Sequence, residues 1–136
     1  MQKVKIEVLN KKIQEEPIEV VYMGNLEEKD GYTSVTYEES ALTGMEGVFT
    51  KLHIDQEEMV LFRTGNIESK MIFRKDHKDV FVYKMEVGSM SMAVETKEYS
   101  IQEEEGTTHV YIRYRLDIAG DVGEENEMNI HITKKS

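Results

Sequence analysis

The alternation of the sequence directs four side chains that could do chemistry toward the protein interior: Arg63, Glu39, Tyr37 and Tyr114. Tyr114 lies on the face of an apolar stripe over residues 110–118, and Glu39 lies on the same face as Tyr37. Arg63 faces inward if Met59 does, although both faces of its strand are apolar. An interior guanidinium stays charged and needs an anionic partner. These residues therefore indicate either a buried ion pair or a binding site for an anion.

The sequence leaves two interpretations of Arg63 open. In the first, Arg63 forms a structural ion pair with Glu39, with Tyr37 as a second partner, at the mouth of a barrel. Replacing Arg63 by methionine would then destabilise the fold, because a carboxylate is left unpaired. In the second, Arg63 binds a ligand carboxylate or phosphate and Tyr114 orients it. The same replacement would then leave stability unchanged or raised while ligand affinity falls.

The methionines also bear on a possible binding site. Five of the nine lie in the central expected strands: Met59, Met71, Met85, Met90 and Met92. Methionine is flexible and polarizable, so it lines adaptable pockets as well as filling irregular cores. We include Met90 and Met92, which share one face of a strand, among the predicted ligand contacts. Plain core filling is the alternative.

No other constellation supports chemistry, so we predict no enzyme, no cofactor and no metal site. The four histidines have no spacing of a known metal motif: His53, His77, His109 and His131. The acidic segment 121–127 lacks the spacing of a calcium loop. There is no cysteine and no nucleophile-elbow serine. Paired carboxylates assembled from distant strands stay open as an acid–base alternative.

The composition narrows the function classes. The length of 136 residues suits one domain spanning 1–136. A net charge of −10 argues against nucleic acid and anionic membranes as partners. No apolar run exceeds four residues, and the first ten residues lack the apolar centre of a signal peptide. The absence of cysteine suits a reducing compartment, so we expect a soluble cytoplasmic protein.

Nearly the whole chain alternates with period two between turn signals, which predicts an all-β antiparallel protein. The expected strands cover residues 4–13, 18–26, 32–39, 48–55, 59–64, 67–74, 80–87, 90–94, 98–103, 110–118 and 128–132. Residues 75–79 form a charged hairpin tip, and helix is limited to about one turn around 40–45. Short turns and the cost of exposed edges favour a closed or nearly closed barrel of eight to ten strands. A two-sheet sandwich is the alternative.

Several short motifs resemble the YwiB-like bacterial proteins, a family of unknown function. They are Tyr37-Glu38-Glu39, Thr43 to Gly47, Arg63-Thr64-Gly65, Gly88 with Thr96, and Tyr114-Arg115-Leu116. The resemblance covers almost the full chain. It implies a lipocalin-like, calycin-type β-barrel, and it implies no activity.

The leading hypothesis is non-catalytic binding of a small apolar or amphiphilic ligand, which could be anionic, inside the barrel. The rival is an interaction module with a barrel filled by side chains, whose outer face binds another protein or a second copy as a homodimer. Tyr111, Phe49 and Phe81, aromatic residues on less apolar faces, favour the rival. An enzyme is the third hypothesis.

Overall fold

The computed structural model describes residues 2–12, 15–40 and 45–135. Within these ranges the chain forms ten strands and no helix, and therefore no helix that could cross a membrane. The strands are β1 (Gln2–Lys12), β2 (Ile18–Lys29), β3 (Tyr32–Glu38), β4 (Val48–Ile54), β5 (Glu58–Gly65), β6 (Ile67–Arg74), β7 (His77–Met85), β8 (Gly88–Glu104), β9 (Thr107–Ile118) and β10 (Glu125–Lys134). The turn of helix expected around 40–45 falls mostly on residues 41–44, which lie outside the described ranges.

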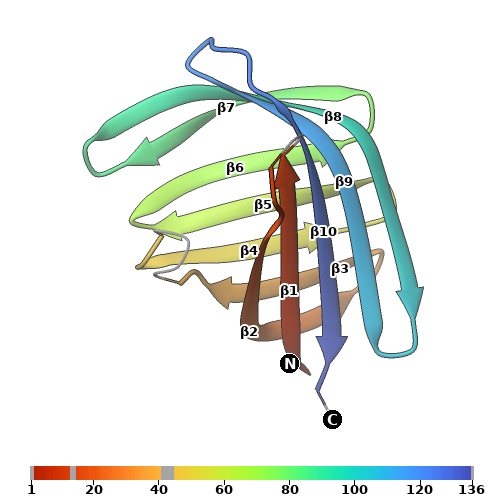
Figure 1. The fold of residues 1–136 in the computed structure, drawn as a ribbon. Coiled ribbons are helices and arrows are strands. Elements are labelled where there is room, and N and C mark those ends of the chain that lie inside the picture. The colour runs from red at the N-terminus through yellow and green to blue at the C-terminus, as the bar shows by residue number, and fades with distance from the viewer. Residues whose placement is uncertain (1, 13–14, 41–44, 136) are drawn as a thin grey trace.

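The ten strands form one closed antiparallel barrel (Figure 1). Every strand pairs with its neighbours in the sequence, and β1 also pairs with β10 to complete the ring. In the view of Figure 1, strands β3 to β7 run roughly horizontally, whereas β1, β9 and β10 run roughly vertically. The predicted closed all-β barrel is confirmed, and the sandwich alternative is wrong.

Strand β8 joins these two groups of strands, and here the sequence prediction was wrong. The segments 90–94 and 98–103, expected as two strands, form one strand of 17 residues. Its pairing with β9 shifts register between Thr96 and Glu98, which marks a bulge. A bulge adds one unpaired residue and bends the strand without ending it. Through this bend β8 passes from its place beside β7, which runs horizontally in Figure 1, to its place beside β9, which runs vertically.

Strand β7 corrects two further expectations. It begins at His77, so only Lys75 and Asp76 form the hairpin turn that was expected to span residues 75–79. Phe81 is buried in the core and pairs with Met92, while its neighbours Val80 and Val82 are exposed. The predicted outward facing of Phe81 was wrong. This strand is apolar on both faces, so its alternation does not indicate which face points into the barrel.

Alternate residues of the other strands pack inside the barrel as the period-two pattern predicts. The largest fully buried side chains include Ile6, Leu52, Ile54, Met59 and Phe73. They come from four strands that are adjacent in the ring or face one another across it. The barrel interior is therefore a packed core around these residues, and it is not an open channel.

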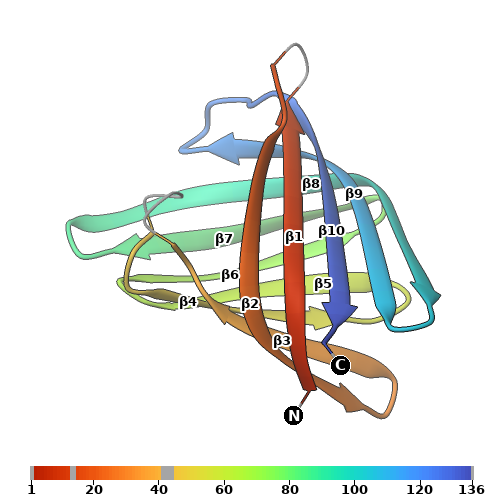
Figure 2. The same cartoon turned by 60° about the horizontal axis from the view of Figure 1, so that its bottom comes forward.

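The wall of the barrel is split along one side. Pairing between β2 and β3 ends at Gly24 and Tyr37. Residues 18–23 of β2 consequently have β1 as their one paired neighbour among the described residues. Figure 2 shows β2 continuing beside β1 while β3 turns away across the barrel. The start of β2 is therefore hydrogen-bonded on one side only among the described residues.

We predict that Gly24→Ala destabilises the fold by about 1–3 kcal/mol, the usual cost of overpacking. A Cβ at this position would overlap the carbonyl oxygen of Thr36, a backbone atom that cannot move without disturbing the β2–β3 ladder. Urea melts measure the change. The exposed neighbour Asn25 provides the control, since Asn25→Ala should change the free energy of unfolding by less than about 0.5 kcal/mol. Equal effects of the two substitutions would contradict the packing at Gly24.

Candidate functional site

A cavity of about 410 Å³, here called the mouth cavity, lies at the end of the barrel where β2 and β3 part. Its apolar wall consists of Val8, Ile18, Val20, Met45, Leu52, Leu61, Met128 and Ile130. Its polar lining consists of Asn10, Lys12, Glu15, Glu16, Tyr22, Tyr37, Glu39, Arg63 and Asn126. A mostly apolar wall with a few convergent polar groups is typical of small-molecule sites.

The alternation of the strands explains why polar groups gather here. Along the inward face of β5 the residues change from fully buried Met59 to Leu61 and then to Arg63. The inward face of β1 changes in the same way from Ile6 to Asn10. Both strands thus supply apolar side chains to the core and polar side chains to the mouth. These polar side chains, here called the polar ring, lie where the inward faces of the strands extend beyond the apolar core.

Glu39 is the buried acid of this ring, with 6% of its surface exposed. One of its oxygens accepts a hydrogen bond from the Tyr22 hydroxyl at 2.7 Å, and the other accepts one from the Thr50 hydroxyl at 2.6 Å. Both carboxylate oxygens therefore have a neutral donor from the protein. A buried carboxylate with such partners is stabilised without a cation in contact.

Arg63 lies beside Glu39 but does not hydrogen-bond to it through its Nε. The Nε atom is 3.9 Å from Glu39 Oε2, and the Arg63 side chain is 16% exposed. This Nε is buried and has no hydrogen-bond partner within the part of the chain that the structure describes. At this separation the two charges attract each other, but the geometry is not that of a hydrogen bond.

Two tyrosines complete the surroundings of Arg63. The Tyr37 ring stacks on Tyr22 with centroids 4.4 Å apart. Tyr114 is buried, its ring meets Phe73 edge-on at 5.2 Å, and its hydroxyl accepts a hydrogen bond of 3.1 Å from Asn10 Nδ2. Burial raises the pKa of Tyr37 far above its usual value, with the charge of Glu39 as the second cause. Burial also raises the pKa of Tyr114.

The structure brings most of the predicted site residues together. Arg63, Glu39 and Tyr37 line one cavity, and Tyr114 joins it through Asn10. Met90 and Met92 do not line it. Met92 is buried in the core and Met90 packs against the core, as plain core filling requires.

Sequence reasoning missed several polar residues of the site, among them Asn10, Tyr22, Thr50 and Asn126. Thr50 and Tyr22 share inward faces with Leu52 and Leu26, and this parity could have identified them. Asn10 Oδ1, like Arg63 Nε, is buried and has no partner among the described residues. Within the part of the chain that the structure describes, the mouth cavity therefore holds one donor and one acceptor that are buried and without a partner.

The structure contains no cluster of three or more potential metal ligands within residues 2–12, 15–40 and 45–135. His109 and His131 form a stacked pair with centroids 4.2 Å apart and ring planes within 10°. The nitrogen lone pairs of parallel rings do not converge on one point. This pair is therefore a packing contact of β9 with β10.

Comparison with known proteins identifies a family and a fold. The domain of unknown function DUF1934 matches residues 3–130. The ywiB protein from Bacillus subtilis has a similar structure, with a TM-score of 0.80 and 20% sequence identity over 98% of this chain and 91% of that chain. No curated protein matches the chain. The resemblance to YwiB-like proteins predicted from the sequence is confirmed, and neither description states an activity.

We predict opposite outcomes for the two members of the Arg63–Glu39 pair. Arg63→Met should change the free energy of unfolding by less than about 1 kcal/mol, because Glu39 keeps both hydroxyl donors. Glu39→Leu should cost about 3–5 kcal/mol, because it leaves the Arg63 charge without a counter-ion. Urea melts of both variants test this asymmetry. A loss of several kcal/mol in Arg63→Met would show that the arginine is a structural ion-pair partner.

We also predict that stability falls as the pH rises above about 10. The folded-state pKa values of Tyr37 and Tyr114 are raised, so their contribution is complete below the pKa of unfolded tyrosine. It is lost as the pH rises toward the folded-state values, because ionisation then favours the unfolded chain. Tyr37→Phe should make the decline shallower in urea melts at increasing pH. An unchanged slope would contradict the burial of the Tyr37 hydroxyl.

Proposed function

We propose that this chain, which belongs to the DUF1934 family, binds a small amphiphilic molecule with an anionic head in its mouth cavity and does not transform it. One observation carries the proposal. The buried Arg63 Nε has no hydrogen-bond partner among the described residues, although it lies in a cavity large enough for a ligand. A buried donor without an acceptor is costly, and a ligand acceptor would remove that cost.

The chemistry of the cavity supports this choice of ligand. A guanidinium binds carboxylate or phosphate through charge-assisted hydrogen bonds, which are stronger than neutral ones. The Asn10 Oδ1 atom offers an acceptor for a hydroxyl or amide group beside the head. The wall of Val8, Val20 and Leu61 suits an apolar body. A volume of about 410 Å³ lies within the range of small-molecule sites, about 300–1,000 Å³.

The carboxylate nearest to Arg63 supports binding rather than catalysis. Glu39 accepts a hydroxyl hydrogen bond on each oxygen from Tyr22 and Thr50, which assigns it a structural role in holding the mouth together. The chain also has no cysteine, which suits action in the reducing cytoplasm.

The rival, an interaction module, has weaker support. It requires a barrel filled by side chains, whereas a cavity occupies the mouth. It also drew on three outward aromatic residues, of which Phe81 lies in the core. Phe49 remains on the outer face with 53% of its surface exposed.

Isothermal titration with octanoate and octyl phosphate tests the proposal. Wild type should bind at least one of them, and Arg63→Met should weaken binding about 10- to 100-fold, as loss of a charged hydrogen bond does. Arg74→Met is the matched control, because Arg74 is an exposed guanidinium paired with Glu57 and Glu58 away from the cavity. It should bind like wild type. No binding by wild type, or equal binding by Arg63→Met, would refute the proposal.

A further inference from the structure

The mouth cavity presents two hydrogen-bonding groups of opposite kind. Arg63 Nε is a buried donor without an acceptor, and Asn10 Oδ1 is a buried acceptor without a donor, among the described residues. Both residues line the cavity. Ser69 and Thr96, which also have buried oxygens without a partner in this part of the chain, do not line it. A ligand in the cavity therefore meets one donor and one acceptor.

A simple anionic head would satisfy only one of these two groups. A carboxylate accepts hydrogen bonds and has none to donate. Bound at Arg63, it would leave the Asn10 oxygen buried without a donor, and a buried polar group without a partner is costly. An alkyl chain beside the same oxygen would leave that cost in place. The ligand that fits best brings a donor to Asn10 as well as an acceptor to Arg63.

Tyr114 determines which atom of the Asn10 amide is left for a ligand. Its hydroxyl accepts the hydrogen bond of 3.1 Å from Asn10 Nδ2, so the amide directs its nitrogen to Tyr114 and leaves Oδ1 without a donor. Tyr114 is buried, and its ring meets Phe73 edge-on, which holds the hydroxyl in place. Tyr114 itself does not line the cavity. It is therefore a positioning residue for Asn10.

The donor that fits Asn10 is a neutral group. The Asn10 amide has no charge to offset that of a buried ammonium group. Glu39, the buried acid of the polar ring, already has a hydroxyl donor on each oxygen and Arg63 at 3.9 Å. A hydroxyl or an amide N–H needs no counter-charge, and a hydrogen bond to Asn10 Oδ1 compensates its removal from water.

We propose that the head of the ligand combines an anionic group, which accepts from Arg63 Nε, with a hydroxyl or amide N–H, which donates to Asn10 Oδ1. A hydroxy acid and an N-acyl amino acid share this chemistry. The inference depends on the proposed function. It adds Asn10 as a residue that determines specificity and Tyr114 as the residue that positions it.

Pairs of acids that differ in one donor provide the test, by isothermal titration of wild type. 2-Hydroxyoctanoate is compared with 2-oxooctanoate, and N-octanoylglycine with N-octanoylsarcosine, in which a methyl group replaces the amide hydrogen. In at least one pair the donor-bearing acid should bind about tenfold more tightly, the effect of satisfying one buried acceptor. The pair that shows the preference identifies the donor as a hydroxyl or an amide. No preference in either pair would overturn the inference without any substitution in the protein.

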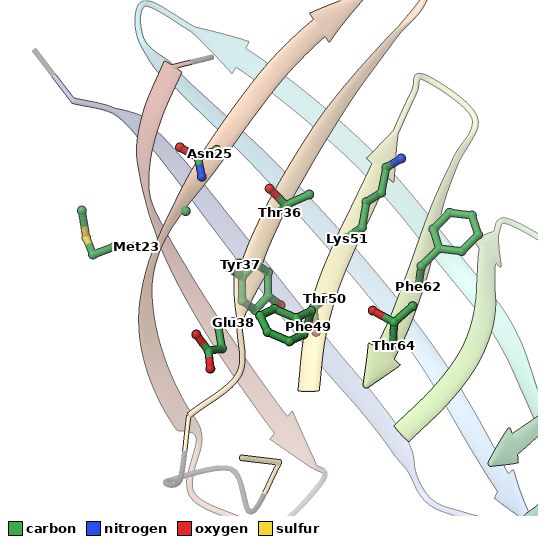
Figure 3. Close-up of a pocket in the computed structure, with 11 residues that line it drawn as sticks. Met23, Asn25, Thr36, Tyr37, Glu38, Phe49, Thr50, Lys51, Phe62 and Thr64 are labelled. Carbon is green, nitrogen blue, oxygen red and sulfur yellow. The ribbon is translucent and has the colours of Figure 1, made fainter. Parts of the chain in front are cut away.

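Asn10→Leu tests the assignment of that preference, because it removes the acceptor at nearly constant volume. The ratio of the two affinities within a pair should fall from about ten to about one. This ratio is insensitive to a general effect of the substitution on the cavity. Asn25→Leu is the matched control and should keep the wild-type ratio, because Asn25 lines a separate hollow on the outer face of the barrel (Figure 3). An unchanged ratio in Asn10→Leu would overturn the inference.

Tyr114→Phe tests the positioning role. Without the hydroxyl, nothing among the described residues directs Asn10 Nδ2 away from the cavity, so the preference for the donor-bearing acid should fall. If Tyr114 only supported the fold, Tyr114→Phe would weaken both acids of a pair equally. That result would overturn the role assigned to Tyr114.

The outcomes separate the two proposals. If neither octanoate, octyl phosphate nor any of these acids binds to wild type, the proposed function falls and this inference falls with it. If octanoate or octyl phosphate binds through Arg63 but no donor-bearing acid is preferred, only the inference falls. A preference for 2-oxooctanoate over 2-hydroxyoctanoate that Asn10→Leu abolishes would place Asn10 Nδ2 in the cavity, which also overturns the inference.

Discussion

A guanidinium that is largely removed from water and cannot lose its proton constrains the whole mouth of this barrel. Arg63 is held there by its place on β5, two residues beyond the buried Leu61 on the same face. Its charge must be offset by something that remains nearby. Glu39 supplies an opposite charge at 3.9 Å but directs its hydrogen bonding to Tyr22 and Thr50. The charge of Arg63 is thereby offset by Glu39, while its Nε–H group has no hydrogen-bond acceptor among the described residues.

The architecture of the barrel makes this arrangement possible. The ring of strands closes through β1 and β10, and its alternation fills the centre with apolar side chains. The same alternation places polar side chains at the mouth, where the core ends. The β2–β3 ladder ends at Gly24 and Tyr37, and the mouth cavity lies at that end. The core, the polar ring and the cavity follow from one pattern of strand lengths and facings.

Period-two alternation predicted the antiparallel strands and the inward facing of Glu39 and Tyr114, because facing depends on local sequence. The closure of the barrel was predicted from the short turns, the cost of exposed edges and the resemblance to the YwiB-like proteins, and it is confirmed. The alternation failed at β8, where a bulge continues a strand across a break in the pattern. It also failed at Phe81, which has apolar residues on both sides.

The hydrogen-bond partners of the site residues could not be predicted from the sequence. Tyr22 lies 17 residues from Glu39, and Asn10 lies 104 residues from Tyr114. Such contacts depend on strand register and on the order of strands around the ring. A single sequence states neither, so the hydroxyl donors of Glu39 and the amide beside Tyr114 emerged only from the fold. The position of Met90 and Met92 away from the mouth has the same cause.

The most direct measurement is the nuclear magnetic resonance signal of the Arg63 Nε–H group during titration with octanoate. The account predicts that this hydrogen has the chemical shift of a guanidinium hydrogen without an acceptor in the free protein, because it has no acceptor among the described residues. Octanoate should then shift the signal saturably downfield, as formation of a hydrogen bond does. A signal that already has the shift of a hydrogen-bonded group in the free protein and does not respond to octanoate would contradict the claim that Arg63 is a vacant anion-binding group.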